Sequence, residues 1–348
     1  MKVALFSTHE FEREFFMRAN IPLHHELLFN SETLHQGTAV MAKDIPAVCV
    51  FLTDELDAAT LSVLARGGTK LLALRSAGYN NVDLEAAARL GITVVRVPAY
   101  APAAIAEHAI ALMLTLNRHI HKAYNRVREG NFDLNGLLGF NMSGKTIGIV
   151  GTGKIGTALA RIMRGFDCEL LGYDVIRNPD CIDIGVRYVD LQMLLAKSDI
   201  VSLHCPLTSE TKHLINEHRL GLMKPRSMLI NTARGAIVDA HAVMEALKNG
   251  GPLLYFGMDV YEEEDSLFFS DRSSTIISDD VFERLTTFPN VVITGHQAFL
   301  TREALTAIAH VTLCNVSDFE AGHLKAENIV AAKGIEARQS TDATASEG

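Results

Sequence analysis

The sequence contains no tryptophan and no C-x-x-C pair, and its five cysteines are irregularly spaced. Without a C-x-x-C pair, neither a zinc knuckle nor a dithiol redox motif is supported. We therefore expect no metal site and five reduced thiols, as is usual in the cytosol. The N-terminal residues also show neither the apolar region nor the cleavage site of a secretory signal peptide, which favours a cytoplasmic protein.

No uninterrupted apolar run reaches the roughly 18 residues that a membrane-spanning helix requires, and no cluster of Lys and Arg marks a basic groove. The balance of 32 basic against 41 acidic residues gives a formal net charge of −9. A net-acidic chain is a poor candidate for binding nucleic acid or an anionic membrane surface. We therefore expect a small-molecule ligand, with neither nucleic acid nor membrane as a partner.

The chain has 348 residues, of which 48% are hydrophobic and 21% are charged. This composition excludes general disorder, and the length is sufficient for two domains with their own cores. In the first hundred residues, short continuous apolar runs alternate with helix-like stretches, which is typical of parallel strands covered on both faces. The expected strands there are Lys2–Phe6, Ala47–Phe51, Lys70–Leu74 and Thr93–Val97.

A second series of strands follows a long apolar helix, Ala103–His119, with Pro102 in its first turn. The expected strands of this series are Thr146–Val150, Glu169–Asp174, Gly185–Tyr188, Ile200–His204, Met228–Asn231, Tyr255–Val260 and Val291–Thr294. Helical stretches separate most of them, and an amphipathic helix, Thr301–Gly322, comes last. The pattern predicts the α/β class with two parallel-sheet domains, the second of them a doubly wound sheet of six or seven strands.

Residues Gly151–Gly156 spell G-T-G-K-I-G, a complete G-x-G-x-x-G motif between the strand Thr146–Val150 and a helix. Asp174 ends the next strand, so the whole context of a dinucleotide-binding loop is present. The first glycine allows a tight turn, the second lets a pyrophosphate approach the backbone, and the third lets helix and strand pack closely. The N-terminus of the helix supplies N–H donors and a positive dipole end to the phosphates.

Asp174 predicts a preference for NAD over NADP, because its carboxylate accepts hydrogen bonds from the adenosine ribose hydroxyls and repels a 2′-phosphate. Arg177 lies close enough in the sequence to soften this preference. The alternative interpretation of the motif is a glycine-rich turn without a ligand. A Walker A loop is rejected, since Ile155 stands where that motif needs Ser or Thr for magnesium.

Three later segments carry polar residues at the ends of expected strands: Asn231–Gly235, Gly257–Glu264 and Thr294–Phe299. The ligand crevice of an open α/β sheet lies at the carboxyl ends of its strands. We therefore expect the polar side chains of these segments to share a site with the dinucleotide loop.

These segments, with several motifs upstream, resemble the signature of the D-isomer-specific 2-hydroxyacid dehydrogenases over about residues 1–330. Besides the glycine loop, the motifs are R-S-A-G-Y-N-N-V-D at Arg75–Asp83, V-P-A-Y at Val97–Tyr100, A-E-H-A at Ala106–Ala109, L-H-C-P-L-T at Leu203–Thr208, N-T-A-R-G at Asn231–Gly235 and D-V-Y-E-E-E at Asp259–Glu264. Two further features resemble the subgroup of bacterial fermentative D-lactate dehydrogenases. They are G-H-Q-A-F-L-T at Gly295–Thr301 and the long stretch Asp265–Phe282.

The resemblance implies an NAD-dependent oxidoreductase that interconverts pyruvate and D-lactate. It implies that His296 is the acid–base residue, that Glu264 holds its ring and that Arg234 binds the substrate carboxylate. The chemistry agrees, because imidazole titrates near physiological pH and a planar guanidinium matches a carboxylate. The alternatives are a structural salt bridge for Arg234, a buried structural His for His296 and a solvated acidic loop for Glu262–Glu264, with Glu263 as the second choice for the acid.

The resemblance also implies which residues contact the cofactor and the substrate. The expected cofactor contacts are Gly151, Thr152, Gly153, Lys154, Ile155, Gly156, Asp174, Cys205, Pro206, Thr211, Thr232, Ala233, Arg234 and Asp259. The expected substrate contacts are Ala77, Gly78, Tyr100, Arg234, His296 and Phe299. The alternatives are core aromatic residues for Tyr100 and Phe299, a buried structural thiol for Cys205 and a strand-end cap for Asp259.

The resemblance further implies that one domain is inserted into the other. The substrate domain comprises 1–98 and 299–335, the NAD-binding Rossmann domain comprises 99–298, and 336–348 is predicted to be a disordered tail. The apolar helix Ala103–His119 and the habit of the family imply a homo-oligomer, a dimer or a tetramer. Two alternatives stay open for the function: the same chemistry on a larger 2-keto acid, and a non-catalytic NAD-sensing regulatory protein.

Overall fold

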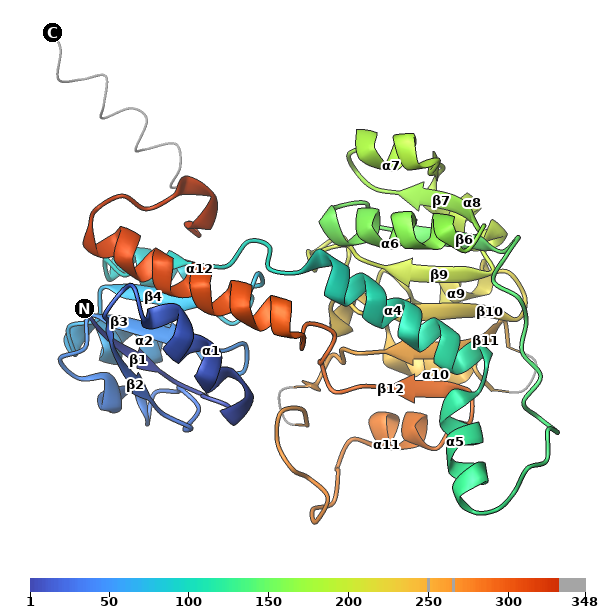
Figure 1. Cartoon of the computed structure of the whole chain (residues 1–348), viewed down its shortest axis with the longest axis horizontal. Coiled ribbons are helices and arrows are strands. Elements are labelled where there is room, and N and C mark those ends of the chain that lie inside the picture. Colours follow the sequence, from blue (N-terminus) through green and yellow to red (C-terminus); the bar gives the residue numbers. More distant parts are fainter. Residues whose placement is uncertain (249–250, 265–266, 332–348) are drawn as a thin grey trace, which may run out of the picture. The chain divides into compact units, whose positions relative to one another are not determined.

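The computed structural model describes residues 1–248, 251–264 and 267–331. The chain forms two compact units, Met1–Ala101 with the chain from Thr301 onward, and Pro102–Leu300 (Figure 1). The first unit is therefore discontinuous in sequence, and the second is inserted into it. The predicted tail at 336–348 lies outside the described residues.

All five strands of the first unit run parallel, in the order β2-β1-β3-β4-β5. Their bounds are Lys2–Leu5 (β1), Glu26–Phe29 (β2), Ala47–Val50 (β3), Leu71–Leu74 (β4) and Thr93–Val95 (β5). The sequence pattern predicts four of them to within two residues but misses β2. That strand lies at the edge of the sheet and alternates between exposed and half-buried residues, so it lacks the continuous burial of the inner strands.

Three helices of the first unit begin at short polar side chains that cap them. Asp57, Asp83 and Thr301 each accept a hydrogen bond from a backbone N–H in the first turn, which satisfies a donor that the helix itself leaves unpaired. The helices of the first unit are α1 (Glu10–Asn20), η1 (Ala39–Ala42), α2 (Ala58–Arg66), α3 (Leu84–Arg89), α12 (Arg302–Glu320) and η4 (Ala326–Asn328).

The returning chain is part of the first unit's core. Helix α12 packs against α1 and β4, and the side chain of Asn315 donates a hydrogen bond to the carbonyl of Arg96 over 3.0 Å. Farther on, the N–H of Val330 bonds the carbonyl of Val94 over 2.9 Å. The last helix therefore completes the fold that the first hundred residues begin.

The second unit has a seven-stranded sheet, also parallel throughout, in the order β12-β11-β10-β9-β6-β7-β8. The strands are β6 (Thr146–Val150), β7 (Glu169–Tyr173), β8 (Arg187–Tyr188), β9 (Ile200–Leu203), β10 (Ser227–Asn231), β11 (Leu253–Met258) and β12 (Val291–Ile293). Each lies within two residues of its predicted position. The strand order reverses between β6 and β9, and a crevice for a ligand opens at such a switch point.

Helices cover both faces of this sheet, each over its own apolar cluster. One face carries α4 (Pro102–Asn117), α6 (Lys154–Gly165) and α7 (Pro179–Ile184). The other face carries α8 (Leu191–Lys197), α9 (Glu217–Gly221), α10 (Ala240–Ala246) and α11 (Asp280–Thr286). The sequence pattern misses the helix α5 (Ile120–Arg128), which follows α4 and has no fully buried residue. Its apolar residues Ile120, Ala123, Tyr124 and Val127 recur at helical spacing, so the signal was present in the sequence and the prediction missed it.

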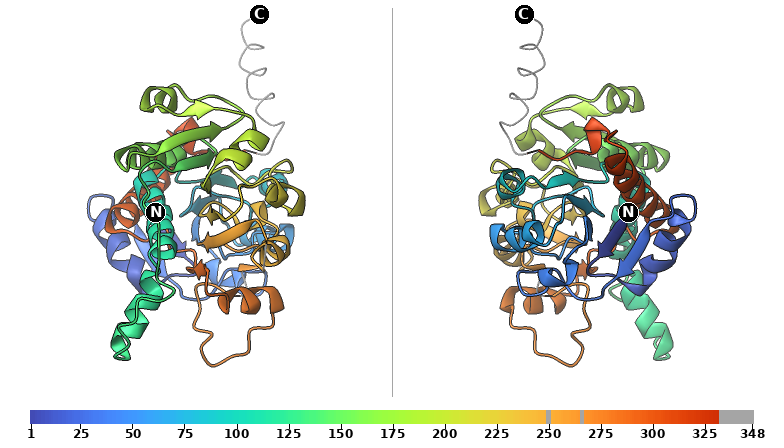
Figure 2. Two further views of the ribbon diagram at one scale, coloured as in Figure 1. Left: turned by 90° about the vertical axis from the view of Figure 1, so that its right-hand side faces the viewer. Right: turned by 90° about the vertical axis from the view of Figure 1, so that its left-hand side faces the viewer.

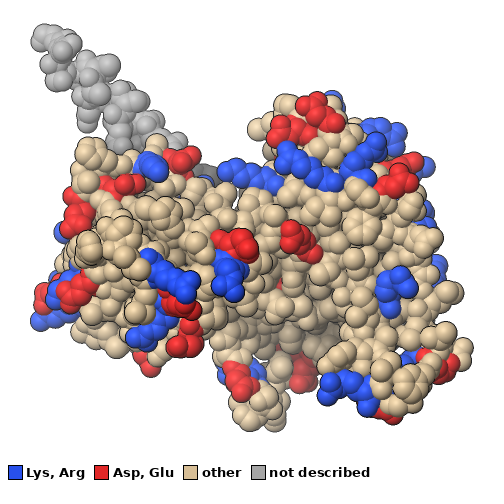
Figure 3. Space-filling model, in the orientation of Figure 1, with Lys and Arg blue, Asp and Glu red and all other residues tan. Residues whose placement is uncertain are grey.

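Acidic and basic side chains lie interspersed over the face of the molecule in Figure 3. Among the residues that the structure describes, no helix combines the length and the apolar content that crossing a membrane requires.

Candidate active site

The glycine loop joins β6 to α6 at the switch point of the second sheet. Gly151 has φ +94°, and a Cβ on it would lie 2.5 Å from the backbone nitrogen of Cys205. The neighbouring strand end therefore leaves room for glycine alone. Gly153 is the N-cap of α6 and has no atom within 4 Å of where a Cβ would be. The first turn of α6, which includes Lys154 and Ile155, thus begins at an open position that suits an anionic phosphate.

Asp174 follows β7, and its carboxylate is bonded to the glycine loop. Its Oδ2 accepts hydrogen bonds from the backbone N–H of Thr152 over 2.6 Å and from the Thr152 hydroxyl over 3.1 Å. The same hydroxyl accepts a hydrogen bond from Tyr188 over 2.7 Å. Buried Thr152 therefore links the glycine loop to residues at the ends of β7 and β8. These bonds hold the carboxylate of Asp174, which is predicted to bind the ribose, in place. Arg177 lies over the ring of Tyr188, 5.9 Å from its centroid.

The first two residues after β9, His204 and Cys205, are both uncharged near the switch point. Burial lowers the pKa of His204 to about 4 and raises the pKa of the Cys205 thiol to about 11. Both side chains are therefore neutral near pH 7. Farther along the chain, the hydroxyl of Thr211 donates a hydrogen bond to the carbonyl of Pro206 over 2.6 Å.

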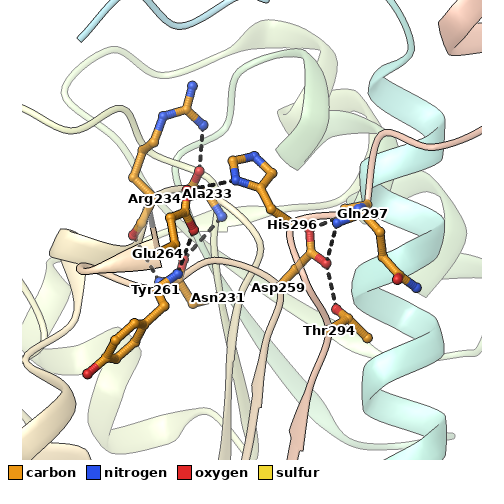
Figure 4. A network of polar contacts seen from close by, with 10 residues as sticks. Asn231, Ala233, Arg234, Asp259, Tyr261, Glu264, Thr294, His296 and Gln297 are labelled. Carbon is orange, nitrogen blue, oxygen red and sulfur yellow. Dashed lines mark hydrogen bonds and ion pairs between the residues drawn. The ribbon is translucent and has the colours of Figure 1, made fainter. Parts of the chain in front are cut away.

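His296 and Glu264 form the central pair of the candidate site (Figure 4). The imidazole Nδ1 lies 2.7 Å from Oε1 of Glu264, and the two side chains are 16% and 13% exposed. The other carboxylate oxygen of Glu264 accepts a hydrogen bond from the N–H of Tyr261 over 2.8 Å. With Nδ1 engaged, Nε2 is the ring nitrogen left for proton transfer. A carboxylate at this distance stabilises the imidazolium.

The other two glutamates of the acidic run have different surroundings. Glu262 contacts the imidazole of His213 at 2.7 Å and the ammonium group of Lys212 at 3.5 Å. Glu263 is exposed. The geometry therefore favours Glu264, the first choice made from the sequence, over Glu263.

Arg234 follows β10 in a loop that Asn231 ties together. The Asn231 amide donates to the carbonyl of Arg234 over 2.9 Å and accepts from the N–H of Ala233 over 3.1 Å. One guanidinium nitrogen of Arg234 donates to the carbonyl of Ala233 over 2.6 Å. Since a guanidinium has five N–H donors, the others are available to a carboxylate. The hydroxyl of Thr232 is buried without a protein partner among the described residues.

Gly235 lets this loop pack directly against the loop that carries Glu264. A Cβ on Gly235 would lie 1.9 Å from the carbonyl carbon of Tyr261 and 2.2 Å from the nitrogen of Glu262. Real Cβ atoms do not approach backbone that closely. Gly235 therefore brings together the segments that hold Arg234 and Glu264.

Asp259 is fully buried, and its carboxylate is occupied by the backbone of the His296 loop. Oδ1 accepts from the N–H of Gln297 over 2.9 Å, and Oδ2 accepts from the N–H of Ala298 over 2.8 Å (Figure 4). This geometry matches the strand-end cap that the sequence left open as an alternative. The expected contact with the cofactor stays a prediction.

Phe269 is a neighbour of His296 that the sequence does not reveal. Its ring centroid lies 5.7 Å from that of His296, and its backbone has φ +62°. The adjacent Phe268 packs its ring against Phe282 instead. The position of Phe269 depends on a turn, in which the N–H groups of Leu267 and Phe268 bond the carbonyl of Glu264. No motif in the sequence marks that turn.

The remaining expected substrate contacts stay predictions. Ala77, Gly78 and Tyr100 belong to the first unit. There the side chain of Arg96 donates to the carbonyl of Ala77 over 3.0 Å, which shapes the loop after β4. Phe299 belongs to the second unit and is 8% exposed. Its low exposure agrees with either a core aromatic or the wall of a small pocket.

The residues present fit a dinucleotide cofactor on three independent observations. The N-terminus of α6 begins at an open glycine, an ordered carboxylate follows β7, and Thr232 has a buried hydroxyl that lacks a partner among the described residues. All three lie in Pro102–Leu300. Dinucleotides bind at this edge of a doubly wound sheet.

Comparison with known proteins agrees with the geometry. Residues 110–298 match the family model described as D-isomer specific 2-hydroxyacid dehydrogenase, NAD binding domain. The chain is 52% identical over 320 residues to 2-hydroxyacid dehydrogenase homolog 1 of Schizosaccharomyces pombe, covering 92% of this chain and 96% of that protein. It is 51% identical over 322 residues to D-lactate dehydrogenase of Escherichia coli strain K12, covering 92% and 98%. The solved apo-structure of D-lactate dehydrogenase from Escherichia coli matches with a TM-score of 0.87 at 48% identity, covering 95% of this chain and 100% of that one.

Replacing Gly235 with alanine should separate the two catalytic loops. The added Cβ overlaps the Tyr261 and Glu262 backbone, so we expect a loss of about 1–3 kcal/mol in the free energy of unfolding. Chemical denaturation measures this loss. Gly165→Ala is the matched control, because no atom lies within 4 Å of its Cβ position. Equal stabilities for the two variants would contradict the proposed close packing at Gly235.

Proposed function

The chain belongs to the D-isomer specific 2-hydroxyacid dehydrogenase family, and from this premise we propose that it interconverts pyruvate and D-lactate with NAD. The observation that carries the proposal is the 2.7 Å contact between His296 and Glu264, beside the loop of Arg234 and in the same unit as the glycine loop. The 51% identity to an enzyme named D-lactate dehydrogenase supports lactate as the product.

The proposed reaction joins pyruvate, NADH and a proton to give D-lactate and NAD⁺. When bound, the nicotinamide supplies the hydride, which goes to the carbonyl carbon. His296 donates the proton from Nε2 to the carbonyl oxygen, and in the reverse direction it takes the hydroxyl proton. Glu264 contributes by stabilising the charged imidazolium before transfer and by fixing the ring through Nδ1.

Arg234 is proposed to bind the substrate carboxylate. A guanidinium matches a carboxylate with two parallel hydrogen bonds and stays charged throughout the working pH range. The movement of Arg234 is limited by two hydrogen bonds, one from its guanidinium to the carbonyl of Ala233 and one from the Asn231 amide to its own carbonyl. The substrate therefore meets a preorganised group. The first unit is proposed as the substrate domain, with the backbone N–H groups of Ala77 and Gly78 as further ligands of the carboxylate.

A panel of 2-keto acids tests the substrate. We expect kcat/KM with NADH to be higher for pyruvate than for 2-oxobutyrate, hydroxypyruvate or phenylpyruvate. One methylene in an apolar pocket changes binding by only about 1–3 kcal/mol, so the ranking has to be measured. The runner-up proposal, a larger 2-keto acid, would be favoured if phenylpyruvate exceeded pyruvate about tenfold. Intact NADH binding without turnover of any keto acid would favour a non-catalytic NAD sensor instead.

His296→Gln tests the acid–base role. Glutamine keeps a polar side chain but cannot deliver the proton, so we expect kcat to fall by about 10²–10⁴-fold while NADH binding, followed by fluorescence, is retained. His310→Gln is the control, because His310 lies on α12 in the other unit. Unchanged kcat in His296→Gln would exclude His296 as the acid.

We further propose a cytoplasmic homo-oligomer, a dimer or a tetramer. The support is an apolar surface on α5 and the following loop, where Ile120, Tyr124, Phe132, Leu134 and Leu138 are 53–90% exposed. Figure 2 shows α5 extending beyond the body of its unit. Exposed apolar side chains gathered in this way are typical of interfaces. Analytical ultracentrifugation is expected to show a dimer or larger, and a stable monomer would contradict the proposal.

A further inference from the structure

The A-E-H-A motif on α4 includes a histidine that the proposed reaction does not use. His108 Nε2 lies 2.9 Å from the hydroxyl of Thr294 and 3.4 Å from Oδ1 of Asp259. The His108 side chain is 18% exposed and that of Asp259 is 1% exposed. These three residues come from α4, the end of β12 and the end of β11, and together they form a polar contact within the second unit.

The hydrogen bonds in this contact have a defined direction. The Thr294 hydroxyl donates its one hydrogen to Oδ1 of Asp259 over 2.5 Å. The hydroxyl can therefore only accept from His108, so Nε2 of His108 carries a hydrogen and donates it. The resulting chain runs from His108 through Thr294 to the carboxylate of Asp259. Consecutive hydrogen bonds of this kind polarise and strengthen one another.

Asp259 passes this constraint on to the acid–base residue. Its carboxylate accepts the N–H groups of Gln297 and Ala298, and its backbone carbonyl accepts the N–H of His296 over 2.7 Å. Three consecutive residues of the catalytic loop are therefore hydrogen-bonded to one residue. The orientation of the carboxylate decides whether both side-chain bonds can form together.

The backbone of His296 needs such a constraint. Its φ is +51°, in the left-handed region that a residue with a Cβ rarely adopts. Such a conformation persists only where surrounding contacts determine it. The His108–Thr294–Asp259 chain and the amides it holds supply these contacts on one side, and Glu264 holds the ring on the other.

We propose that His108 and Thr294 are positioning residues, which hold the proton-donating nitrogen of His296 in place through the carboxylate of Asp259. Neither His108 nor Thr294 is proposed to touch the reacting atoms. The inference rests on the proposed function, since it assigns His296 the proton transfer. The inference also gives a role to α4, whose A-E-H-A motif is among those that resemble the family but has no part in the proposed reaction.

Paired variants of Thr294 test the proposal. Thr294→Val keeps the shape and removes the hydroxyl, whereas Thr294→Ser keeps the hydroxyl and removes a methyl group. For Thr294→Val we expect kcat to fall about tenfold or more, because a small displacement of a catalytic group is costly. The KM for the keto acid should change less than about twofold, because the proposal places the effect on proton transfer and not on binding of the keto acid. Thr294→Ser should keep kcat within about threefold of the wild type.

A second pair locates the effect on the hydrogen-bonded chain. His108→Leu removes the donor, whereas His108→Gln places an amide N–H near the position of Nε2 and should restore part of the lost kcat. Because both residues act through one chain, His108→Leu combined with Thr294→Val should lower kcat little more than either change alone. Fully additive losses, or a Val variant that behaves like the Ser variant, would overturn the proposal. A lower Tm with unchanged kcat would also overturn it, because that result indicates a merely structural role.

Crystal structures of the two Thr294 variants give a readout that does not depend on activity. We expect residues 295–298 and the Asp259 carboxylate to shift in Thr294→Val and to stay in place in Thr294→Ser. An unmoved loop in both would overturn the inference, whatever the enzyme assay shows. If the wild type reduces no 2-keto acid, the proposed function fails by itself, and the loop positions still decide whether His108 and Thr294 position His296.

Discussion

The 2.7 Å contact between Nδ1 of His296 and Oε1 of Glu264 is the interaction on which the proposed catalytic geometry depends. The two residues lie outside the strands of the sheet, after β12 and β11. Each is fixed by a close backbone contact, since Gly235 brings the Arg234 loop against the residues that precede Glu264. On the other side, Asp259 binds the loop of His296. Contacts between loops therefore position His296, the proposed proton donor, without a helix or strand.

A similar arrangement holds the cofactor edge of the sheet. The carboxylate of Asp174 bonds Thr152, and the Thr152 hydroxyl also bonds Tyr188, so the glycine loop is connected to the ends of two strands. Ordered loops bind a ligand with a smaller entropic cost than loops that order on binding. The side chains of His204 and Cys205, which follow β9, are neutral near pH 7.

The buried carboxylate of Asp259 is surrounded by hydrogen-bond donors. Asp259 has almost no exposed surface and accepts hydrogen bonds from two backbone amides and one hydroxyl. A buried carboxylate without such partners would destabilise the fold. The hydrogen bonds that satisfy Asp259 also hold the segment 296–298, so the stability of the fold and the position of the proposed acid–base residue, His296, have a common origin.

The sequence by itself determined the α/β class, the positions of the inner strands to within two residues and the family to which the chain belongs. It could do so because these features leave local signals: continuous apolar runs, a glycine motif after a strand, and polar residues at strand ends. Edge strand β2 left no such signal, because it lies largely outside the core. Helix α5 carries apolar residues at helical spacing, and the prediction missed them. Only the tertiary structure decided that Glu264 rather than Glu263 faces His296, that Phe269 covers the imidazole and that His108 contacts Asp259. Each of these contacts joins residues whose distance depends on the course of a loop or on the packing of a helix, and neither is encoded in a short pattern of residue types.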